Sequence, residues 1–363
     1  MTAGKNILIA GGKTGGHLFP GIAVAEVLRE RGVTVAFIGT RGGLEEKELP
    51  ARGFPLEFIT VGGLKGKNLV ATLKNLLLLP YALFQSLRII GKHRADAVVS
   101  LGGFAAGPAA LAAKLRGRRV FVMEQNSIPG ITNRIVGRFA DRICMSFPDV
   151  AGRFPDDRTL LTGNPVRREV IGAPRRRLDT DRPVLAVFGG SQGASSLNGL
   201  MMELVTAHPA VADRFHIIHQ TGEKELAAVR GHYAAAGVEA EVQPFVRDVG
   251  GWYKAADIIV CRAGATTIAE LTALRKPAIY VPFPHAADNH QYYNARSAVE
   301  QGGGFIVEDA GPLSEKGAKL AALLEEICGD RAAWQARMGA SAGTRADEAI
   351  ADAILADLGG GGA

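Results

Sequence analysis

Two segments of the chain begin with the same order of features. An apolar run comes first, a glycine-rich stretch follows, and a helical pattern of apolar residues completes the unit. The first unit covers residues 6–10, 11–17 and 21–31, and the second covers 183–188, 189–194 and 196–207. A continuous apolar run predicts a strand in a parallel sheet that helices cover on both faces. The repetition therefore predicts an α/β fold with two domains, each opening with a strand, a glycine loop and a helix.

Other apolar runs predict the remaining strands of two parallel sheets. We expect them at residues 33–38, 97–100, 120–123 and 142–145 in the first half, and at 216–219, 241–244, 258–261, 278–281 and 304–307 in the second. Helical patterns separate most of these runs, which is typical of doubly wound sheets.

The domain boundary is expected near the turn residues 163–165. They precede a basic stretch at 175–177 and then the second opening strand. We therefore expect an N-terminal domain at residues 1–163 and a C-terminal domain at 164–339. A final helix, at residues 340–358, is compatible with packing on either domain, and we assign it to the N-terminal one.

The cysteines exclude a disulfide framework. Cys144, Cys261 and Cys328 are far apart in sequence and odd in number, which fits a reducing compartment. The chain shows neither a signal-peptide pattern nor a run of about 18 apolar residues, so we expect no transmembrane helix. His285, Asp288 and His290 lie close in sequence, but their spacing matches no zinc motif, and we expect no bound metal.

Positive charge is concentrated in the first half. Residues 1–165 contain 22 Lys and Arg against 12 Asp and Glu, whereas the remainder contains 20 against 24. Residues 64–119 combine ten basic residues and one acidic residue with apolar residues at helical spacing. Most of this apolar stripe fits a core, but the basic surplus is typical of a helix on an anionic membrane surface. Aromatic residues are only 6% and no recognition motif is present, so nucleic acid is not an expected partner.

The first glycine-rich stretch predicts an anion site. Glycines let the backbone approach a ligand closely and present N–H groups at a helix N-terminus. The stretch is not a Walker A loop, because Ile7 stands where that motif needs glycine, and no acidic residue ends the second strand as in a dinucleotide site. A tight structural turn is the alternative. His17 at the helix start fits two roles equally: a general base for a substrate hydroxyl, or a residue that only hydrogen-bonds the turn.

Two stretches in the second half predict anion sites of the same kind. The loop at 189–193 adds the hydroxyl of Ser191, and residues 264–266 follow a predicted strand at the start of a helix. Glu270 lies one turn after Thr266 on the same helix face, where a carboxylate can accept both hydrogen bonds of a vicinal diol such as a ribose. The alternative for Glu270 is a first-turn acid that stabilises the helix dipole.

Seven motifs occur in an order that resembles the MurG family of bacterial N-acetylglucosaminyltransferases. They are GKTGGHLFP (12–20), GGF (102–104), EQN (124–126), GNPVR (163–167), GGSQGA (189–194), RAGAT (262–266) and QYYNA (291–295). The resemblance extends from the first strand to at least Glu308, with one departure at Lys13, where the family has glycine. It implies a GT-B fold, in which two Rossmann-like, doubly wound domains are separated by a cleft, and it implies no bound metal or other cofactor.

The resemblance also implies an activity. The family transfers N-acetylglucosamine from UDP-GlcNAc to the C4 hydroxyl of MurNAc in undecaprenyl-linked lipid I, forming lipid II for peptidoglycan. It is an inverting hexosyltransferase of cell wall biogenesis, cell shape and cell division. We thus expect a peripheral protein on the cytoplasmic face of the bacterial inner membrane, where cell-wall synthesis proteins are conceivable partners. The alternatives left open are an enzyme with another lipid acceptor such as diacylglycerol, a UDP-GlcNAc epimerase, and a non-catalytic UDP-sugar-binding protein.

Residues at matching positions receive roles from the resemblance. For the donor UDP-GlcNAc they are Arg167, Ser191, Gln192, Val246, Ala265, Thr266, Glu270, Gln291 and Asn294, with Val246 at the uracil, Glu270 at the ribose, and Gln291 and Asn294 at the sugar. For the acceptor and its pyrophosphate they are Thr14, Gly15, Gly16, Gly103 and Asn126, of which Thr14, Gly15, Gly16 and Asn126 are also candidate donor contacts. His17 is the first choice of catalytic base, and Glu124 is its rival.

Overall fold

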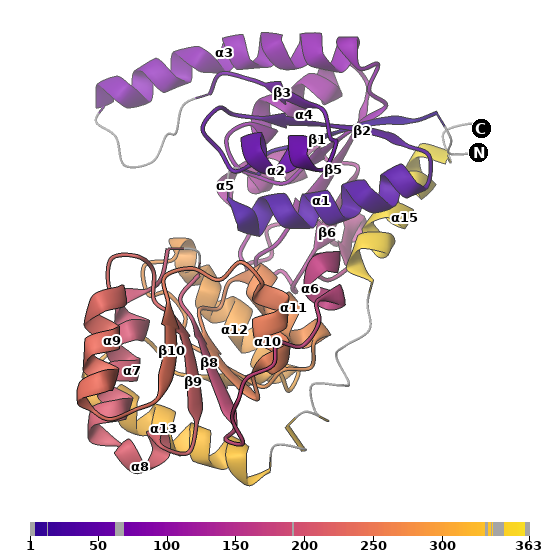
Figure 1. Cartoon of the computed structure of the whole chain (residues 1–363). Helices are drawn as coiled ribbons and strands as arrows, with labels where there is room; N and C mark the ends of the chain where they lie inside the picture. Colours follow the sequence, from indigo (N-terminus) through magenta and orange to yellow (C-terminus); the bar gives the residue numbers. More distant parts are fainter. Residues whose placement is uncertain are drawn as a thin grey trace. The chain divides into compact units, whose positions relative to one another are not determined.

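The chain folds as two units, each around its own parallel sheet (Figure 1). The structure, a computed structural model, describes residues 4–12, 14–61, 69–190, 192–330, 333–334, 336 and 345–359. Unit 1 consists of Met1–Val166 and Thr344–Ala363, and unit 2 of Arg167–Gly343.

Unit 1 contains a seven-stranded parallel sheet in the order β3-β2-β1-β4-β5-β6-β7. Its strands are β1 (Asn6–Ala10), β2 (Thr34–Gly39), β3 (Leu56–Phe58), β4 (Ala97–Ser100), β5 (Arg119–Glu124), β6 (Arg142–Met145) and β7 (Thr159–Leu161). Its helices are α1 (Gly15–Glu30), α2 (Glu45–Ala51), α3 (Leu69–Lys92), α4 (Ala106–Leu115), α5 (Ile131–Gly137), the 3-10 turn η1 (Asp156–Arg158) and α15 (Ala346–Gly359). The strand order reverses between β1 and β4, as in a Rossmann sheet.

Both faces of this sheet are buried. Along β1, Ile7 and Ile9 belong to one apolar core and Leu8 and Ala10 to the other, because successive side chains of a strand point to opposite faces. Helices α1 and α15 pack side by side on the first face, while α3 and α4 pack on the second (Figure 1). Helix α15 buries Ile350 in the first core, so the C-terminal helix is part of unit 1.

Unit 2 contains a six-stranded parallel sheet in the order β10-β9-β8-β11-β12-β13. Its strands are β8 (Val184–Phe188), β9 (His216–Gln220), β10 (Ala240–Gln243), β11 (Ile258–Cys261), β12 (Ala278–Tyr280) and β13 (Gly304–Ile306). Its helices are α6 (Arg168–Gly172), α7 (Ser195–Ala207), α8 (Pro209–Ala212), α9 (Leu226–Ala235), α10 (Val249–Ala255), α11 (Ala265–Ala273), the turn η2 (Ala287–Asn289), α12 (His290–Glu300) and α13 (Leu313–Gly329). The order reverses between β8 and β11, so unit 2 repeats the plan of unit 1.

Every predicted strand is present, and strand ends differ from the prediction by at most one residue. Two strands were missed, β3 and β7, because each has three residues, lies at a sheet edge and is only partly buried. The predicted start of the first helix, at residue 21, is wrong. Helix α1 begins at Gly15, since the residues of the glycine loop form its first turn and Pro20 lies inside the helix.

The predicted C-terminal helix at 340–358 corresponds to α15, which begins at Ala346. Residues 340–344 of that prediction lie outside the described part of the chain. None of the helices in the described residues combines the length and the apolar character that a membrane span requires.

Candidate active site

Two glycine loops meet at the reversal point of the unit 1 sheet. One follows β1 and contains Gly11 and Gly12, and the other follows β4 and contains Gly102 and Gly103. All four have φ angles between 80° and 111°, which other residues rarely adopt. A Cβ atom on Gly11 would clash with the carbonyl oxygen of Gly102, so glycine is what allows the two loops to touch. Ligands of open α/β sheets bind at this end of the strands, beside the reversal point.

The predicted residues Thr14, Gly15, Gly16 and His17 form the start of α1. The carbonyl oxygen of Thr14 accepts hydrogen bonds from the N–H groups of His17 at 3.1 Å and Leu18 at 3.0 Å. The N-terminus of a helix carries partial positive charge, which favours an anion there. The hydroxyl of Thr14 also lies 3.0 Å from Nδ1 of His17. This contact is expected if His17 only hydrogen-bonds the turn. It is equally expected if His17 is a general base, because it holds the imidazole ring in one orientation.

Glu124 is buried at the end of β5 and holds the loop that follows. Its Oε1 accepts hydrogen bonds from the backbone N–H of Asn126 at 2.9 Å and from Nδ2 of Asn126 at 3.3 Å. Its Oε2 accepts from the backbone N–H of Gly130 at 3.1 Å and from Nδ2 of Asn133 at 3.0 Å. Both carboxylate oxygens are thus engaged by the protein, and Glu124 can take a substrate proton only by weakening these hydrogen bonds.

Unit 2 repeats the glycine loop between β8 and α7. Gly190 and Gly193 have φ angles of 88° and 76°, and a Cβ atom on Gly193 would clash with the carbonyl oxygen of Thr221. Gln192, a predicted donor contact, is exposed in this loop. Ser191 lies outside the described residues, as does Lys13 in the first loop.

Arg262, which follows β11, connects three segments beside the reversal point of unit 2. Its guanidinium donates to Oδ2 of Asp309 at 3.0 Å and to the hydroxyl of Ser196 at 2.6 Å. Lys316 donates to the other oxygen of Asp309 at 3.1 Å. Burial raises the pKa of Asp309, but hydrogen bonds from Ser196, Lys316 and Arg262 outweigh burial and hold this pKa below its usual value. The network fixes the start of α7 relative to the loop before α11.

Helix α11 brings together two predicted donor contacts. It begins at Ala265, which places Ala265 and Thr266 in its first turn. Glu270 lies beyond the first turn and is buried, so it is not the first-turn acid of the alternative interpretation. Arg167 donates to Oε1 of Glu270 from Nε at 2.9 Å and from Nη2 at 2.7 Å. Burial raises the pKa of Glu270, and the charge and hydrogen bonds of Arg167 oppose that rise.

The predicted sugar contacts lie on α12 and stabilise nearby loops. The backbone N–H of Phe283 donates to Oε1 of Gln291 at 2.9 Å. Asn294 is completely buried, and its Nδ2 lies 3.4 Å from the carbonyl oxygen of Ala263, just before α11. A direct contact of Gln291 or Asn294 with the sugar stays a prediction.

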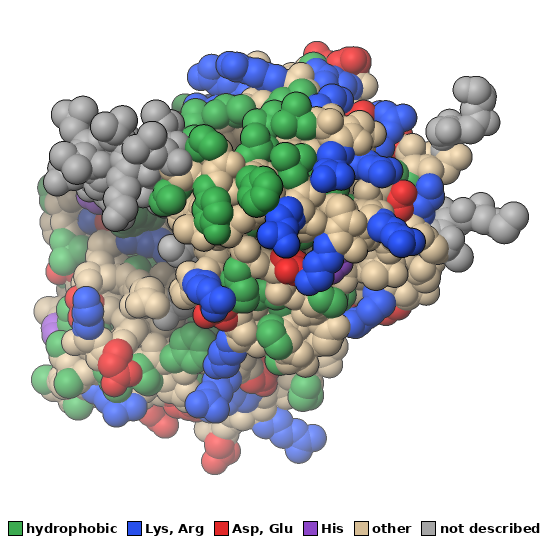
Figure 2. Space-filling model, turned by 90° about the horizontal axis from the view of Figure 1, so that it is seen from above, with side chains coloured by type: hydrophobic (Ala, Val, Ile, Leu, Met, Phe, Trp, Pro, Cys, Tyr) green, Lys and Arg blue, Asp and Glu red, His purple; other side chains and the backbone are tan. Residues whose placement is uncertain are grey.

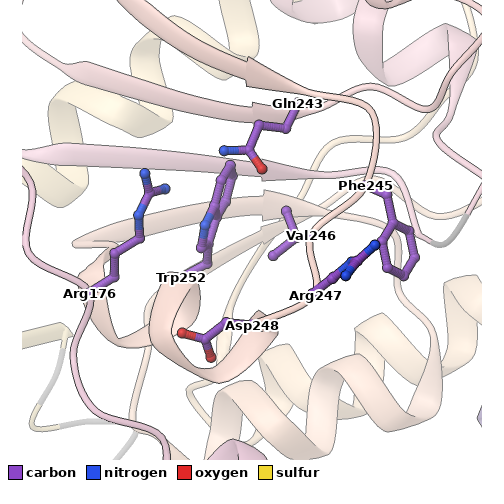
Figure 3. Close-up of a pocket in the computed structure, with 7 residues that line it drawn as sticks. All are labelled: Arg176, Gln243, Phe245, Val246, Arg247, Asp248 and Trp252. Atoms are coloured by element: carbon purple, nitrogen blue, oxygen red, sulfur yellow. The ribbon is translucent and has the colours of Figure 1, made fainter.

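Val246 lines a pocket of about 500 Å³ at the end of β10 (Figure 3). The guanidinium of Arg176 lies over the indole ring of Trp252, 5.1 Å from its centroid. The carboxylate of Asp248 accepts a hydrogen bond from the N–H of Gly251 at 2.9 Å, which caps α10. The lining residues are Arg176, Gln243, Phe245, Val246, Arg247, Asp248 and Trp252. The aromatic side chains of Phe245 and Trp252 among polar side chains suit a planar heterocycle such as a nucleobase.

No group of three or more His, Cys, Asp or Glu side chains within the described residues is arranged to hold a metal ion. His285 and His290 are both in the described part of the chain. The expectation that catalysis needs no metal stays a prediction.

Sequence reasoning missed several buried polar residues that organise these loops. Asn133 contacts Glu124, Asp309 contacts Arg262, and Asn198 on α7 donates to the carbonyl oxygen of Thr221 at 3.0 Å. The contacts of Asp309 and Asn198 join residues 47 and 23 positions apart, and Asn133 also accepts from Ser100, 33 positions away. No local motif marks these positions, because a single polar residue on a helix, such as Asn133 or Asn198, or in a loop, such as Asp309, is also what a solvent-facing position looks like.

Two units with the Rossmann strand order, each with a glycine loop at its reversal point, have the architecture found in the GT-B class of glycosyltransferase folds. The sequence profile of the glycosyltransferase family 28 N-terminal domain matches residues 7–145, and that of the family 28 C-terminal domain matches residues 184–353. The chain belongs to glycosyltransferase family 28. The predicted fold class and the resemblance to the MurG family are both confirmed.

Relatives and solved structures agree with this assignment. A protein of Anaeromyxobacter sp. (strain Fw109-5) is 50% identical over 309 residues, which is 84% of this chain and 80% of that protein. One of Myxococcus xanthus (strain DK1622) is 44% identical over 313 residues, or 85% and 82%. Both are named UDP-N-acetylglucosamine--N-acetylmuramyl-(pentapeptide) pyrophosphoryl-undecaprenol N-acetylglucosamine transferase. The crystal structure of Acinetobacter baumannii MurG matches with a TM-score of 0.79 and 29% identity, over 96% of this chain and 99% of that one. A UDP-N-acetylglucosamine 2-epimerase, at 13% identity and a TM-score of 0.69, shares the fold alone.

Proposed function

We propose that this protein transfers N-acetylglucosamine from UDP-GlcNAc to the C4 hydroxyl of MurNAc in undecaprenyl-pyrophosphoryl-MurNAc-pentapeptide, lipid I. The product is lipid II, the precursor of peptidoglycan. The observation that carries the proposal is 50% identity over 84% of the chain to a relative named for this transfer. The two glycine loops and the buried Glu270–Arg167 pair support it, because the substrates contain pyrophosphate groups and a ribose.

Unit 2 binds the donor in this proposal. The uracil enters the pocket beside the backbone of Val246, and the ribose hydroxyls donate to Glu270. Arg167 supports this role, because its two hydrogen bonds to one oxygen fix the orientation of the buried carboxylate. The diphosphate meets Ala265 and Thr266 at the start of α11 together with Arg167.

The remaining donor contacts come from the loop after β8 and from α12. Ser191 and Gln192 reach the diphosphate, and Gln291 and Asn294 reach the hydroxyl groups of the sugar. The buried position of Asn294 supports an indirect contribution as well, since its amide stabilises the loop before α11.

Unit 1 binds the acceptor in this proposal. Thr14, Gly15 and Gly16 at the start of α1 bind the lipid pyrophosphate, with Gly103 on the adjoining loop. Asn126, held by Glu124, contacts the acceptor sugar. The contact between the loops after β1 and β4 supports this grouping, because it places both at the reversal point of one sheet.

The reaction is a single inverting displacement. The acceptor oxygen forms a bond to C1 of N-acetylglucosamine, the bond from C1 to the phosphate oxygen breaks, and UDP leaves with the electron pair. The hydroxyl proton passes to a base, and His17 is the residue we assign. When Nδ1–H of His17 donates to the hydroxyl of Thr14, 3.0 Å away, Nε2 is the basic nitrogen of the ring.

Glu124, the rival base, fits a positioning role better. Four N–H groups donate to its two oxygens, and accepting a proton would disrupt them. Charge that develops on the departing diphosphate is stabilised by helix N-termini and by Arg167, without a metal ion.

Unit 1 docks on an anionic membrane surface in this proposal, at the cytoplasmic face of the inner membrane. Three neighbouring helices, α3, α4 and α5, expose large apolar side chains: Tyr81, Phe84, Leu111, Leu115, Ile131 and Ile135. Figure 2 shows hydrophobic side chains gathered beside Lys and Arg side chains on the face of this unit seen from above. Such a mixture buries apolar area in the interface and attracts anionic lipids. Residues 64–68, at the start of the predicted basic segment, lie outside the described residues.

The activity is tested by incubating the purified protein with UDP-GlcNAc, with and without a lipid I analogue, and measuring UDP release. We expect release only when the acceptor is present. Release without acceptor, or release with a diacylglycerol acceptor but not with the lipid I analogue, would contradict the proposal.

A further inference from the structure

Asn133 on α5 joins two loops of unit 1. Its side chain is buried, with 1% of the residue exposed. Its Oδ1 accepts a hydrogen bond from the hydroxyl of Ser100 at 2.9 Å, at the end of β4. Its Nδ2 donates to Oε2 of Glu124 at 3.0 Å and to the carbonyl oxygen of Met123 at 3.1 Å, at the end of β5. One amide therefore connects the carboxyl ends of two adjacent strands.

The connection continues into both loops. The hydroxyl of Ser100 accepts a hydrogen bond from the N–H of Gly102 at 3.3 Å, which leads to Gly103. On the other side, Glu124 holds both the backbone and the side chain of Asn126. A Cβ atom on Gly102 would lie 3.2 Å from Nδ2 of Asn133, so the amide also packs directly against the first of these loops.

We propose that Asn133 is a positioning residue for acceptor binding, which fixes the Glu124 carboxylate and sets the spacing between the loop containing Gly103 and the loop containing Asn126. This inference rests on the proposed function, in which Gly103 and Asn126 contact the acceptor. The amide meets both requirements without a change of protonation, because one end accepts from Ser100 while the other donates to Glu124. Aspartate has the same shape but offers Glu124 a second carboxylate oxygen.

The charged groups around Asn133 determine what replacing its amide with a carboxylate would do. Glu124, on β5, is the titratable group in contact with the Asn133 side chain. Strand β4 contributes the neutral Ser100, and Lys114 of the adjacent α4 is exposed. On α5 itself, Nε of Arg134 donates to the carbonyl oxygen of Pro129 at 2.6 Å. A carboxylate at position 133 would therefore interact mainly with Glu124, and the two would share a proton as the pH falls.

The test compares Asn133→Asp with Asn133→Ala across a pH series. At about pH 8 we expect each variant to lose about tenfold or more in kcat/KM for a lipid I analogue, because a buried acceptor loses its donor. Towards about pH 5 a proton shared by the two carboxylates restores the donor, so Asn133→Asp should recover activity relative to wild type. Asn133→Ala should not recover at any pH.

Asn198→Asp in unit 2 is the matched control. Asn198 is also buried, and its Nδ2 also donates to a carbonyl oxygen and to a carboxylate, those of Thr221 and Glu225. The same chemical change there should weaken binding of UDP-GlcNAc, measured by calorimetry, and leave the acceptor KM within about twofold of wild type. Asn133→Asp should show the reverse pattern, with an increased acceptor KM and an unchanged donor Kd.

Two further measurements cover the case in which the Asn133 variants do not fold. Ser100→Ala removes one hydroxyl without burying a charge, and it should raise the acceptor KM several-fold while the donor Kd stays constant. Hydrogen exchange of the folded Ser100→Ala protein should accelerate at the N–H of Gly102, which has lost its acceptor. Unchanged acceptor KM and unchanged exchange in that variant would overturn the inference.

The outcomes separate the inference from the function on which it rests. Without acceptor-dependent turnover in the wild-type protein, the proposed function fails. With wild-type turnover, the inference fails if Asn133→Asp and Asn133→Ala have the same pH profile, or if their donor and acceptor constants change together.

Discussion

Replacing Glu270 with alanine should weaken binding of the donor UDP-GlcNAc about 100-fold. The carboxylate of Glu270 is buried and accepts the two ribose hydroxyls in the proposed complex. A hydrogen bond to a charged group contributes about 1.5–3 kcal/mol, so two lost bonds amount to at least about 3 kcal/mol. Since about 1.4 kcal/mol corresponds to a factor of ten, the Kd for UDP-GlcNAc should rise about 100-fold. The change also removes the partner of Arg167, whose side chain is only 23% exposed, which adds to the loss.

Isothermal titration calorimetry with UDP-GlcNAc measures this effect, and the acceptor KM serves as the internal reference. Glu300→Ala is a suitable control, because it also removes a carboxylate paired with an arginine, Arg296 at 2.8 Å, but on the exposed surface of α12. The control should bind the donor as wild type does. A donor Kd that stays unchanged in Glu270→Ala would refute the assignment of the ribose to this residue.

Three further predictions concern the base, the Asp309 network and the membrane. His17→Ala should lower kcat by about 10²–10⁴-fold while the donor Kd is retained; a change in kcat of only a few-fold would exclude His17 as the base. The lowered pKa of Asp309 gives stability that is present above the unfolded pKa of about 3.9 and is lost as the pH falls through the folded value. Thermal melts from neutral to acid pH should therefore show a smaller acid-induced loss in Asp309→Asn than in wild type, and parallel curves would contradict this. Binding to anionic vesicles should weaken with added salt and with Ile131→Ser, whereas Ile171→Ser on unit 2 should have no effect; equal binding to neutral vesicles would contradict the docking surface.

The strands were predictable because both sheets are buried on both faces. Residues 6–10 and 184–188 are almost entirely apolar, and this pattern is sufficient to locate a central parallel strand. Strands β3 and β7 lie at the two edges of the sheet, where each pairs with a single neighbouring strand and is only partly buried. Their three residues therefore do not form a continuous apolar run that would identify a strand. The start of α1 was missed because glycines and a proline, normally helix breakers, occupy its first turns.

The site was predictable only in part, and the reason is geometric. Glycine loops reveal themselves locally, since a positive φ angle or a close backbone contact demands glycine at Gly11 and Gly193. The pairing of Arg167 with Glu270 joins residues 103 positions apart, and tertiary structure alone brings them together. Asn133 was missed for the same reason, because its function depends on two strand ends that are adjacent only in the folded sheet.

The central claim is that the chain joins N-acetylglucosamine to lipid I with inversion at C1. The most direct measurement is to isolate the product formed from UDP-GlcNAc and a lipid I analogue and to determine its linkage by NMR. The account predicts a single disaccharide in which N-acetylglucosamine is β-linked to the C4 oxygen of MurNAc. An α linkage, attachment at another hydroxyl, or an epimerised UDP-sugar without any disaccharide would contradict it.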